Sequence, residues 1–385
     1  MNAESKRLLE TIESVPFFST FLKQSKQHLF SEETIVFLQS MIDKLHETHS
    51  LWALHKYNII KKRIDLPQRS SFHYIPNELS RFIESYCIES YQYELQFPSR
   101  KILLHICSNR LSSKELESIV QKIFHWYSFI DSYSSCSTEM DIYMYLLPHK
   151  KELPSVSSHS LGRSHVNTAF TTGCQTKTSI YIFRKEEWFK VLIHESFHNL
   201  GLDFLALPEK ELLRIHHQLK ELFHIQLEDL RFYETYCEVW ATILNTMFFS
   251  YYNLSFQHVP YKKLLENIHT CLCYESFFSL CQCVKVLKHN HTKYSIRSFH
   301  TYKEDTQVFC YYVLKSILLV FFPDFLSFCA KNKTLKFPKD VSILNRFFDL
   351  IVNHYQHPFY LHWISELEKR NVRTSHLRMT FIEMK

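Results

Sequence analysis

Three residues of this sequence have the types and the spacing of a metal centre. His194, Glu195 and His198 form the pattern His-Glu-x-x-His. On a helix, residues four apart lie on one face about one turn from each other, so both imidazoles can reach a single ion. Neutral imidazole is a common ligand of Zn²⁺, and a carboxylate beside the first ligand is placed to take a proton from water. The pattern therefore predicts a Zn²⁺ site with His194 and His198 as ligands and Glu195 as general base.

A later segment, YETYCEVWATILN (233–245), carries carboxylates that could complete the site. An HExxH motif followed by a helical Glu-x-x-Ala resembles the gluzincin-type zinc metallopeptidases, which are zincins. Glu238 and Ala241 match that second motif, and Glu238 follows His198 by 40 residues. The resemblance implies that Glu238 is the third ligand, that the fold is zincin-like, and that the substrate is a peptide or protein.

Two other carboxylates remain alternatives for the third ligand. Glu234 lies one turn before Glu238 on the same helix face. The string HESFHNLGLDF also resembles the metzincin pattern, but the metzincin ligand position falls on Phe204 and Asp203 comes one residue early. Asp203 is therefore expected either as an alternative ligand or as a hydrogen-bond partner of a ligand histidine.

The segment of about residues 165–245 also resembles uncharacterised metallopeptidases of large double-stranded DNA viruses, through the strings VNTAFTTG, EEWFKVLIHESFHNLGLDF and YETYCEVWA. In such enzymes an edge strand before the metal-binding helix binds the peptide by strand addition. The resemblance therefore implies substrate contacts by Asn167, Ala169 and Phe170. An oxyanion donor is also expected, and five residues qualify by type: Tyr233, Tyr236, His216, His217 and His224.

Hydrophobic spacing predicts the elements that must position these residues. A mixed α/β region is expected, with the HExxH helix beginning at its acidic residues Glu186 and Glu187. The strands are expected at 101–108, 141–148, 165–171 and 178–184, with a helix at 114–133 between the first two.

The rest of the chain reads as helix. The sequence predicts an α+β fold in three parts: an N-terminal helical region (1–95), an α/β zincin subdomain (96–205) and a C-terminal helical subdomain (206–385) that carries the third ligand. In the last part, the helices are expected at 209–229, 231–251, 261–289, 304–331 and 341–369.

Glycine is rare, and its three positions lie close together. Gly162, Gly173 and Gly201 all fall within 40 residues around the motif. Gly201 is expected to end the metal-binding helix, and all three are expected where the backbone turns sharply or needs a positive φ.

Charge and cysteine usage bear on partners and compartment. The net charge of +6 is mild and has no basic stripe beyond Lys61–Arg63, so no nucleic-acid partner is expected. No membrane span is expected, because Lys315, Pro323 and Asp324 interrupt the apolar segment 308–330, which is instead predicted to be a buried core helix. Eleven cysteines with no repeating spacing, and no signal peptide, favour a reducing, cytoplasmic location in a cell or, for a viral protein, in a host cell or virion.

The sequence thus supports two hypotheses and leaves the oligomeric state open. The first is a zinc metallopeptidase that hydrolyses peptide bonds with Glu195 as the base. The second is a zincin-fold structural or interaction protein without peptidase activity. The cysteines of 271–283, which could suggest a structural zinc, are expected to be buried thiols because no turn residues separate them.

Overall fold

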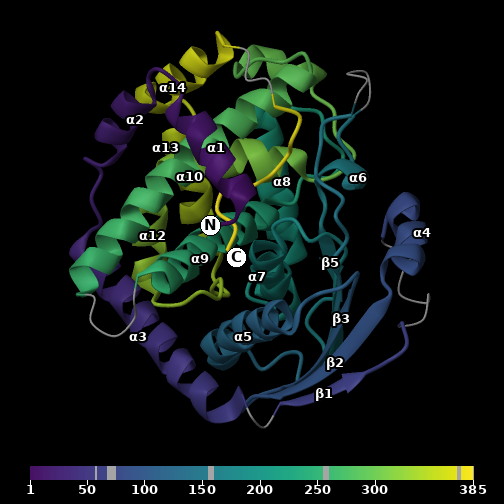
Figure 1. Cartoon of the computed structure of the whole chain (residues 1–385). Coiled ribbons are helices and arrows are strands. Elements are labelled where there is room, and N and C mark those ends of the chain that lie inside the picture. Colours follow the sequence, from purple (N-terminus) through teal and green to yellow (C-terminus); the bar gives the residue numbers. More distant parts are fainter. Residues whose placement is uncertain (57–58, 67–74, 155–159, 255–259, 371–373, 385) are drawn as a thin grey trace. The chain divides into compact units, whose positions relative to one another are not determined.

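The protein has a mixed α+β fold with a six-stranded mixed sheet and many helices (Figure 1). The computed structural model describes residues 1–56, 59–66, 75–154, 160–254, 260–370 and 374–384. The chain forms two compact units. We call residues 39–151 and 167–205 the sheet unit, and residues 1–38, 152–166 and 206–385 the helical unit. The three-part division expected from the sequence stays a prediction.

The sheet unit contains the whole sheet and the HExxH helix. Its elements are most of α3 (Glu32–His55), β1 (Ile60–Arg63), α4 (Asn77–Tyr86), β2 (Glu89–Gln96), β3 (Lys101–Ser108), α5 (Ser113–Ile130), β4 (Glu139–Tyr145), β5 (Ala169–Thr171), β6 (Lys177–Ile182) and α7 (Trp188–Asn199).

The strand order is β1-β2-β3-β4-β6-β5. β3, β4 and β6 are parallel, while β1, β2 and β5 pair antiparallel with their neighbours. α5 makes the crossover between the parallel strands β3 and β4, as such a connection requires. Figure 1 shows α5 on one side of the sheet and α4 on the other. The strand predicted at 101–108 is confirmed, and the helix predicted at 114–133 is confirmed as α5.

Aromatic rings form a row across the α4 side of the sheet. His105, Tyr143, Tyr181 and Phe170 are register partners on β3, β4, β6 and β5. Neighbouring ring centroids lie 4.5, 4.8 and 4.6 Å apart and the rings are nearly parallel. The rings stack on one another across the strands, and such cross-strand pairs stabilise a sheet.

The helical unit is built almost entirely of helices. It contains α1 (Ala3–Glu13), α2 (Phe18–Ser25), the start of α3, α6 (Arg163–Val166), α8 (Glu209–Phe223), α9 (Phe232–Asn253), α10 (Tyr261–His289), a π-helix (Phe309–Leu314), α11 (Lys315–Val320), α12 (Phe322–Asn332), α13 (Val341–His354) and α14 (Pro358–Glu368). The helix predicted at 261–289 is confirmed as α10.

Several predicted elements are wrong. The supposedly helical residues 1–95 include β1 and β2. The strand expected at 165–171 shortens to β5, because His165 lies in the short helix α6. The helix expected at 304–331 is three pieces that bend at Phe321, whose φ and ψ of −109° and 39° are not helical. The helix expected at 341–369 stops before Pro358, which starts α14 because proline fits the first turn of a helix.

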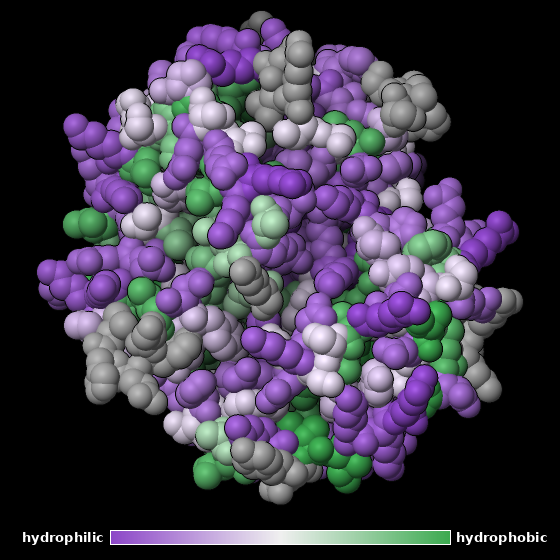
Figure 2. All heavy atoms as spheres, viewed as in Figure 1, coloured by the Kyte–Doolittle hydropathy of each residue, from purple (hydrophilic) through white to green (hydrophobic). Residues whose placement is uncertain are grey.

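The apolar segment 308–330 is buried in the helical unit, as predicted, although it is not one helix. Among the described residues, no single helix is long and apolar enough to cross a membrane. Two consecutive helical segments, Phe309–Val320 and Phe322–Asn332, would together be long and apolar enough by length and composition alone. They are bent by 87° relative to each other. On the face drawn in Figure 2, hydrophilic residues predominate and hydrophobic ones are scattered among them.

The last residues of the chain run through the core of the helical unit. Leu377, Arg378, Phe381 and Ile382 are at most 2 % exposed. The carboxylate of Glu275 on α10 accepts hydrogen bonds from the Thr380 hydroxyl and the Ile382 amide. Burial raises the pKa of Glu275 to about 7. The C-terminal segment is therefore part of the folded core.

This buried carboxyl predicts a pH-dependent stability. The Glu275 carboxyl ionises above a pH of about 4.5 in the unfolded chain but keeps its proton up to a pH of about 7 in the folded state, so the folded state loses stability as the pH rises between these values. Glu275→Gln imitates the protonated form. Urea unfolding at pH 5 and pH 8 should therefore show a loss of stability that is about 2–3 kcal/mol smaller in the variant than in the wild type. Equal losses in the two proteins would contradict this assignment.

Candidate metal centre

α7 begins differently from the prediction. Glu186 and Glu187 precede the helix instead of forming its first turn, and Glu187 has a left-handed backbone (φ 58°). The Glu187 carboxylate forms a fully buried ion pair with Lys151, while the Glu186 carboxylate accepts a hydrogen bond from the Lys151 amide. These acids therefore tie the start of α7 to the chain that follows β4.

α7 ends at the predicted glycine. The Gly201 amide donates to the His198 carbonyl and the Leu202 amide to the Phe197 carbonyl, which is the Schellman pattern. Gly201 has φ +59°, and a Cβ there would lie 3.2 Å from that of Cys174. Among the three glycines only Gly201 has a positive φ, and Gly173 lies in the turn between β5 and β6.

Side chains of the sheet unit hold the last turn of α7 from several directions. Asn199 donates to the Thr171 hydroxyl (3.0 Å) and the Thr172 carbonyl (3.1 Å) in the β5–β6 hairpin. The hydroxyls of Ser134 and Ser137 donate to the carbonyls of Leu200 and Asn199. The carbonyls at a helix end lack partners within the helix, so these contacts fix the turn that carries His198.

Two further contacts support the helix. The Ser196 hydroxyl, inside the motif, accepts a hydrogen bond from the Trp126 indole on α5 (2.9 Å). A disulfide joins Cys136, in the loop before β4, to Cys174, in the β5–β6 turn, beside Gly201. The sequence did not indicate this pair, since eleven scattered cysteines have no pairing pattern.

The two histidines of the motif point toward one another. Their Nε2 atoms lie 3.3 Å apart. Two nitrogens at about 2.05 Å from one ion in a tetrahedral arrangement would lie about 3.3 Å apart. His194 is 6 % exposed and the His198 side chain 15 %. The geometry expected of a pair of zinc ligands is thus present within α7, and Glu195 between them is buried to 8 % exposure.

Asp203 takes one of its two predicted positions. Its Oδ2 lies 2.7 Å from Nδ1 of His198, and its Oδ1 accepts the Leu205 amide. With the proton on Nδ1, His198 donates to Asp203 and keeps the Nε2 lone pair for a metal. Asp203 therefore makes the contact expected of a hydrogen-bond partner of His198, the second of its two predicted roles.

Asp203→Asn should weaken Zn²⁺ binding 10- to 100-fold, which is the usual effect of losing a carboxylate behind a ligand histidine. The affinity can be measured by competition with a chromophoric chelator. The protein should stay folded, because the neutral amide keeps an oxygen for the Leu205 amide. Unchanged affinity would show that Asp203 does not orient a ligand.

On α9, Glu238 already has a cationic partner. Its Oε1 lies 2.9 Å from Nζ of Lys315 on α11, and both side chains are 1 % exposed. The Lys315 ammonium also donates to the Met379 carbonyl of the C-terminal segment. Lys315, which interrupts the apolar segment in the sequence, thus neutralises the carboxylate expected to be the third ligand.

Glu234 lies in a different environment, one turn earlier. Its Oε2 accepts a hydrogen bond from the Tyr311 hydroxyl (3.2 Å). Arg231, at the start of α9, is close enough to interact electrostatically with the Glu234 carboxylate. Three polar side chains of α9 are buried: Glu234, Glu238 and Asn245 are 8, 1 and 2 % exposed.

The five candidate oxyanion donors differ in how exposed they are and in the hydrogen bonds that they already make. Tyr236 is 2 % exposed and donates to the Leu335 carbonyl, so its hydroxyl has a structural role. Tyr233 is half-buried beside Glu234, and its hydroxyl interacts with Arg231. His217 and His224 are exposed on α8 and at its end, whereas burial lowers the pKa of His216. Tyr233 is the donor best placed next to a possible ligand.

The expected substrate strand is at the sheet edge, but its side chains are engaged. β5 ends the strand order, which confirms an edge strand. Phe170 belongs to the stacked aromatic row and Ala169 is buried on the opposite face. The Asn167 carbonyl accepts from the Arg184 guanidinium (3.0 Å). The backbone of β5, more than these side chains, is therefore suited to contact a peptide.

The cysteines of α10 behave as buried thiols. Burial raises the pKa of Cys271 to about 11, and those of Cys273, Cys281 and Cys283 to about 12. Since thiolate is the form that binds zinc, these sites oppose metal binding. Cys273, Cys281 and Cys283 are buried, as expected, whereas Cys271 is only partly buried.

Comparison with known proteins identifies no relative: no protein-family model, no curated protein and no solved structure matches the chain.

Proposed function

We propose that this protein is a zinc-dependent metallopeptidase of gluzincin type. The observation that carries the proposal is the pair of Nε2 atoms of His194 and His198, 3.3 Å apart, with Asp203 behind His198. A ligand pair, a buried carboxylate between them and an orienting aspartate are the parts that a catalytic zinc site needs.

The third ligand is expected on α9. The sequence resemblance favours Glu238, but its ammonium partner Lys315 would have to be displaced before the carboxylate could bind a cation. The Glu234 carboxylate, by contrast, accepts a hydrogen bond from the neutral Tyr311 hydroxyl. We therefore prefer Glu234 as the ligand and assign Glu238 a structural role.

The bound Zn²⁺ would act as a Lewis acid that polarises a water molecule and the scissile carbonyl. Glu195 accepts the proton of the attacking water and then delivers it to the leaving nitrogen, so the carboxylate ends in its initial state. Tyr233 donates a hydrogen bond to the oxygen on which negative charge develops. The edge strand β5 holds the peptide backbone in an extended conformation.

Metal content and a peptide-library assay test the proposal. Purified full-length protein should bind one Zn²⁺, lose it in His194→Ala, and cleave members of a random peptide library in a chelator-sensitive way. Protein without stoichiometric zinc, with a His194→Ala variant of equal metal content, would refute the metal centre. Zinc binding without any cleavage would instead support the alternative, a zincin-fold structural or interaction protein.

A further inference from the structure

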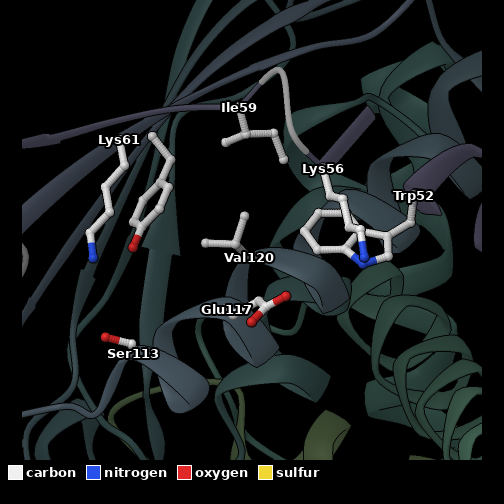
Figure 3. Close-up of a pocket in the computed structure, with 8 residues that line it drawn as sticks. Trp52, Lys56, Ile59, Lys61, Ser113, Glu117 and Val120 are labelled. Atoms are coloured by element: carbon white, nitrogen blue, oxygen red, sulfur yellow. The ribbon is translucent and has the colours of Figure 1, made fainter. Parts of the chain in front are cut away.

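A cavity of about 320 Å³ lies within the sheet unit and shares no residue with the HExxH motif. It is bounded by the end of α3, by β1 and β2, and by the first half of α5 (Figure 3). Its volume is at the lower end of the range of small-molecule sites, which is about 300–1,000 Å³. The residues that line it are Trp52, Lys56, Ile59, Lys61, Tyr93, Ser113, Glu117 and Val120.

The floor of the cavity is apolar and aromatic. Trp52, Tyr93 and Val120 are 7, 6 and 2 % exposed, so they are fixed in the core and present only part of their surface. The Trp52 ring packs against that of Phe124, with centroids 5.5 Å apart. A flat apolar group of a ligand would contact rigid ring surfaces here. Because these side chains are already fixed, binding would cost little conformational entropy.

The rim carries more positive than negative charge. Figure 3 shows Lys61 and Lys56 on opposite sides of the opening with Val120 between them. The Lys61 ammonium lies 4.3 Å from the centroid of the Tyr91 ring, a cation–π contact that holds it at the rim. Ser113 is the first residue of α5, so the positive end of the helix dipole adds to the two lysines. Glu117 is the one carboxylate among the lining residues.

We infer that this cavity binds a small aromatic anion, a carboxylate or sulfonate with two or three rings, and that the rings lie on Trp52 and Val120 and the negative charge at Lys61. Burial raises the pKa of Tyr93 to about 12, so its hydroxyl stays protonated and can donate to the anion. The lysine run of β1, which the proposed peptidase function leaves unexplained, then has a role. The inference does not depend on the metal centre.

Two naphthalene probes of similar shape test the inference on the full-length protein. Anilinonaphthalene sulfonate carries a negative charge and N-phenyl-naphthylamine is neutral, and the fluorescence of each rises on binding. The anion should bind the wild type more tightly than the neutral probe. Lys61→Gln should weaken the anion three- to fivefold and leave the neutral probe unchanged, because one partly screened charge is lost.

The chain offers a matched control next to Lys61. Lys62 is register partner of Gln92, whereas Lys61 is partner of Tyr93, so the two side chains lie on opposite faces of the sheet. Lys62→Gln should therefore leave both affinities unchanged, and Val120→Phe, which fills the cavity, should weaken both probes at least tenfold. Near-ultraviolet circular dichroism checks that each variant is folded. Equal effects of Lys61→Gln and Lys62→Gln, or unchanged binding to folded Val120→Phe, would overturn the inference.

Discussion

Glu195→Gln is expected to lower kcat/KM for peptide hydrolysis about 10³-fold while Zn²⁺ binding and thermal stability stay near those of the wild type. Glutamine has the size of glutamate, so the buried position keeps its packing. It cannot accept a proton from water, and the loss of a general base typically costs 10²- to 10⁴-fold. The measurements are kcat/KM on a cleaved library peptide, zinc by atomic emission, and thermal unfolding.

Glu139→Gln is the matched control, because it removes one carboxylate from the same unit. The Glu139 side chain is 58 % exposed on β4 and pairs with Lys177 at the surface. The Glu139→Gln variant should retain the kcat/KM of the wild type. If Glu195→Gln and Glu139→Gln had equal activities, Glu195 would not be the base, even if the protein were a peptidase.

The second large expected effect is a loss of stability when the buried ion pair of Lys315 and Glu238 is broken. Lys315→Met should lower the free energy of unfolding by about 3–5 kcal/mol, because it leaves the Glu238 carboxylate buried without its cation. The double variant Lys315→Met with Glu238→Leu should recover most of that loss, since an apolar pair of similar volume can replace a buried ion pair. Urea unfolding of both variants and of the wild type measures the difference.

The same variants decide between the two carboxylates of α9. If Glu234 is the third ligand, the double variant Lys315→Met with Glu238→Leu keeps its zinc. Glu234→Gln should then bind zinc at least 100-fold more weakly than the wild type. Glu234→Gln should also unfold at nearly the wild-type urea concentration, because its amide oxygen can still accept from Tyr311. Loss of zinc from the double variant, with retention in Glu234→Gln, would restore Glu238 as the ligand.

The fold could be predicted from the sequence where residue patterns are regular. The strand at 101–108 and α10 have the predicted bounds, because the first is a short apolar run and the second follows helical spacing, each between clear breaks. The segment 304–331 could not be resolved in the same way. It is apolar nearly throughout, so the spacing of its residues does not show that Phe321 leaves the helical conformation before the next helix starts at Phe322.

The candidate site, too, could be predicted only where its residues are close together in the sequence. His194, Glu195, His198 and Gly201 are close in sequence, so helix geometry alone places them. The pairing of Glu238 with Lys315 joins residues 77 positions apart, and the motif Glu-x-x-Ala contains no sign of it. Likewise, Glu186 and Glu187 look like acids of a first helical turn, and only the buried Lys151 amide and ammonium show their actual role.

The interleaving of the two units along the chain has a consequence for biosynthesis. The sheet unit is complete once Leu205 has been synthesised, while the helical unit still lacks its C-terminal segment, including Leu377 and Ile382 in its core. Since domains fold during translation as their residues emerge, the sheet unit is free to form first. The apolar surfaces of α9 and α10 then stay without their C-terminal partners until up to about 130 further residues have been synthesised, so we expect the helical unit to complete its core last.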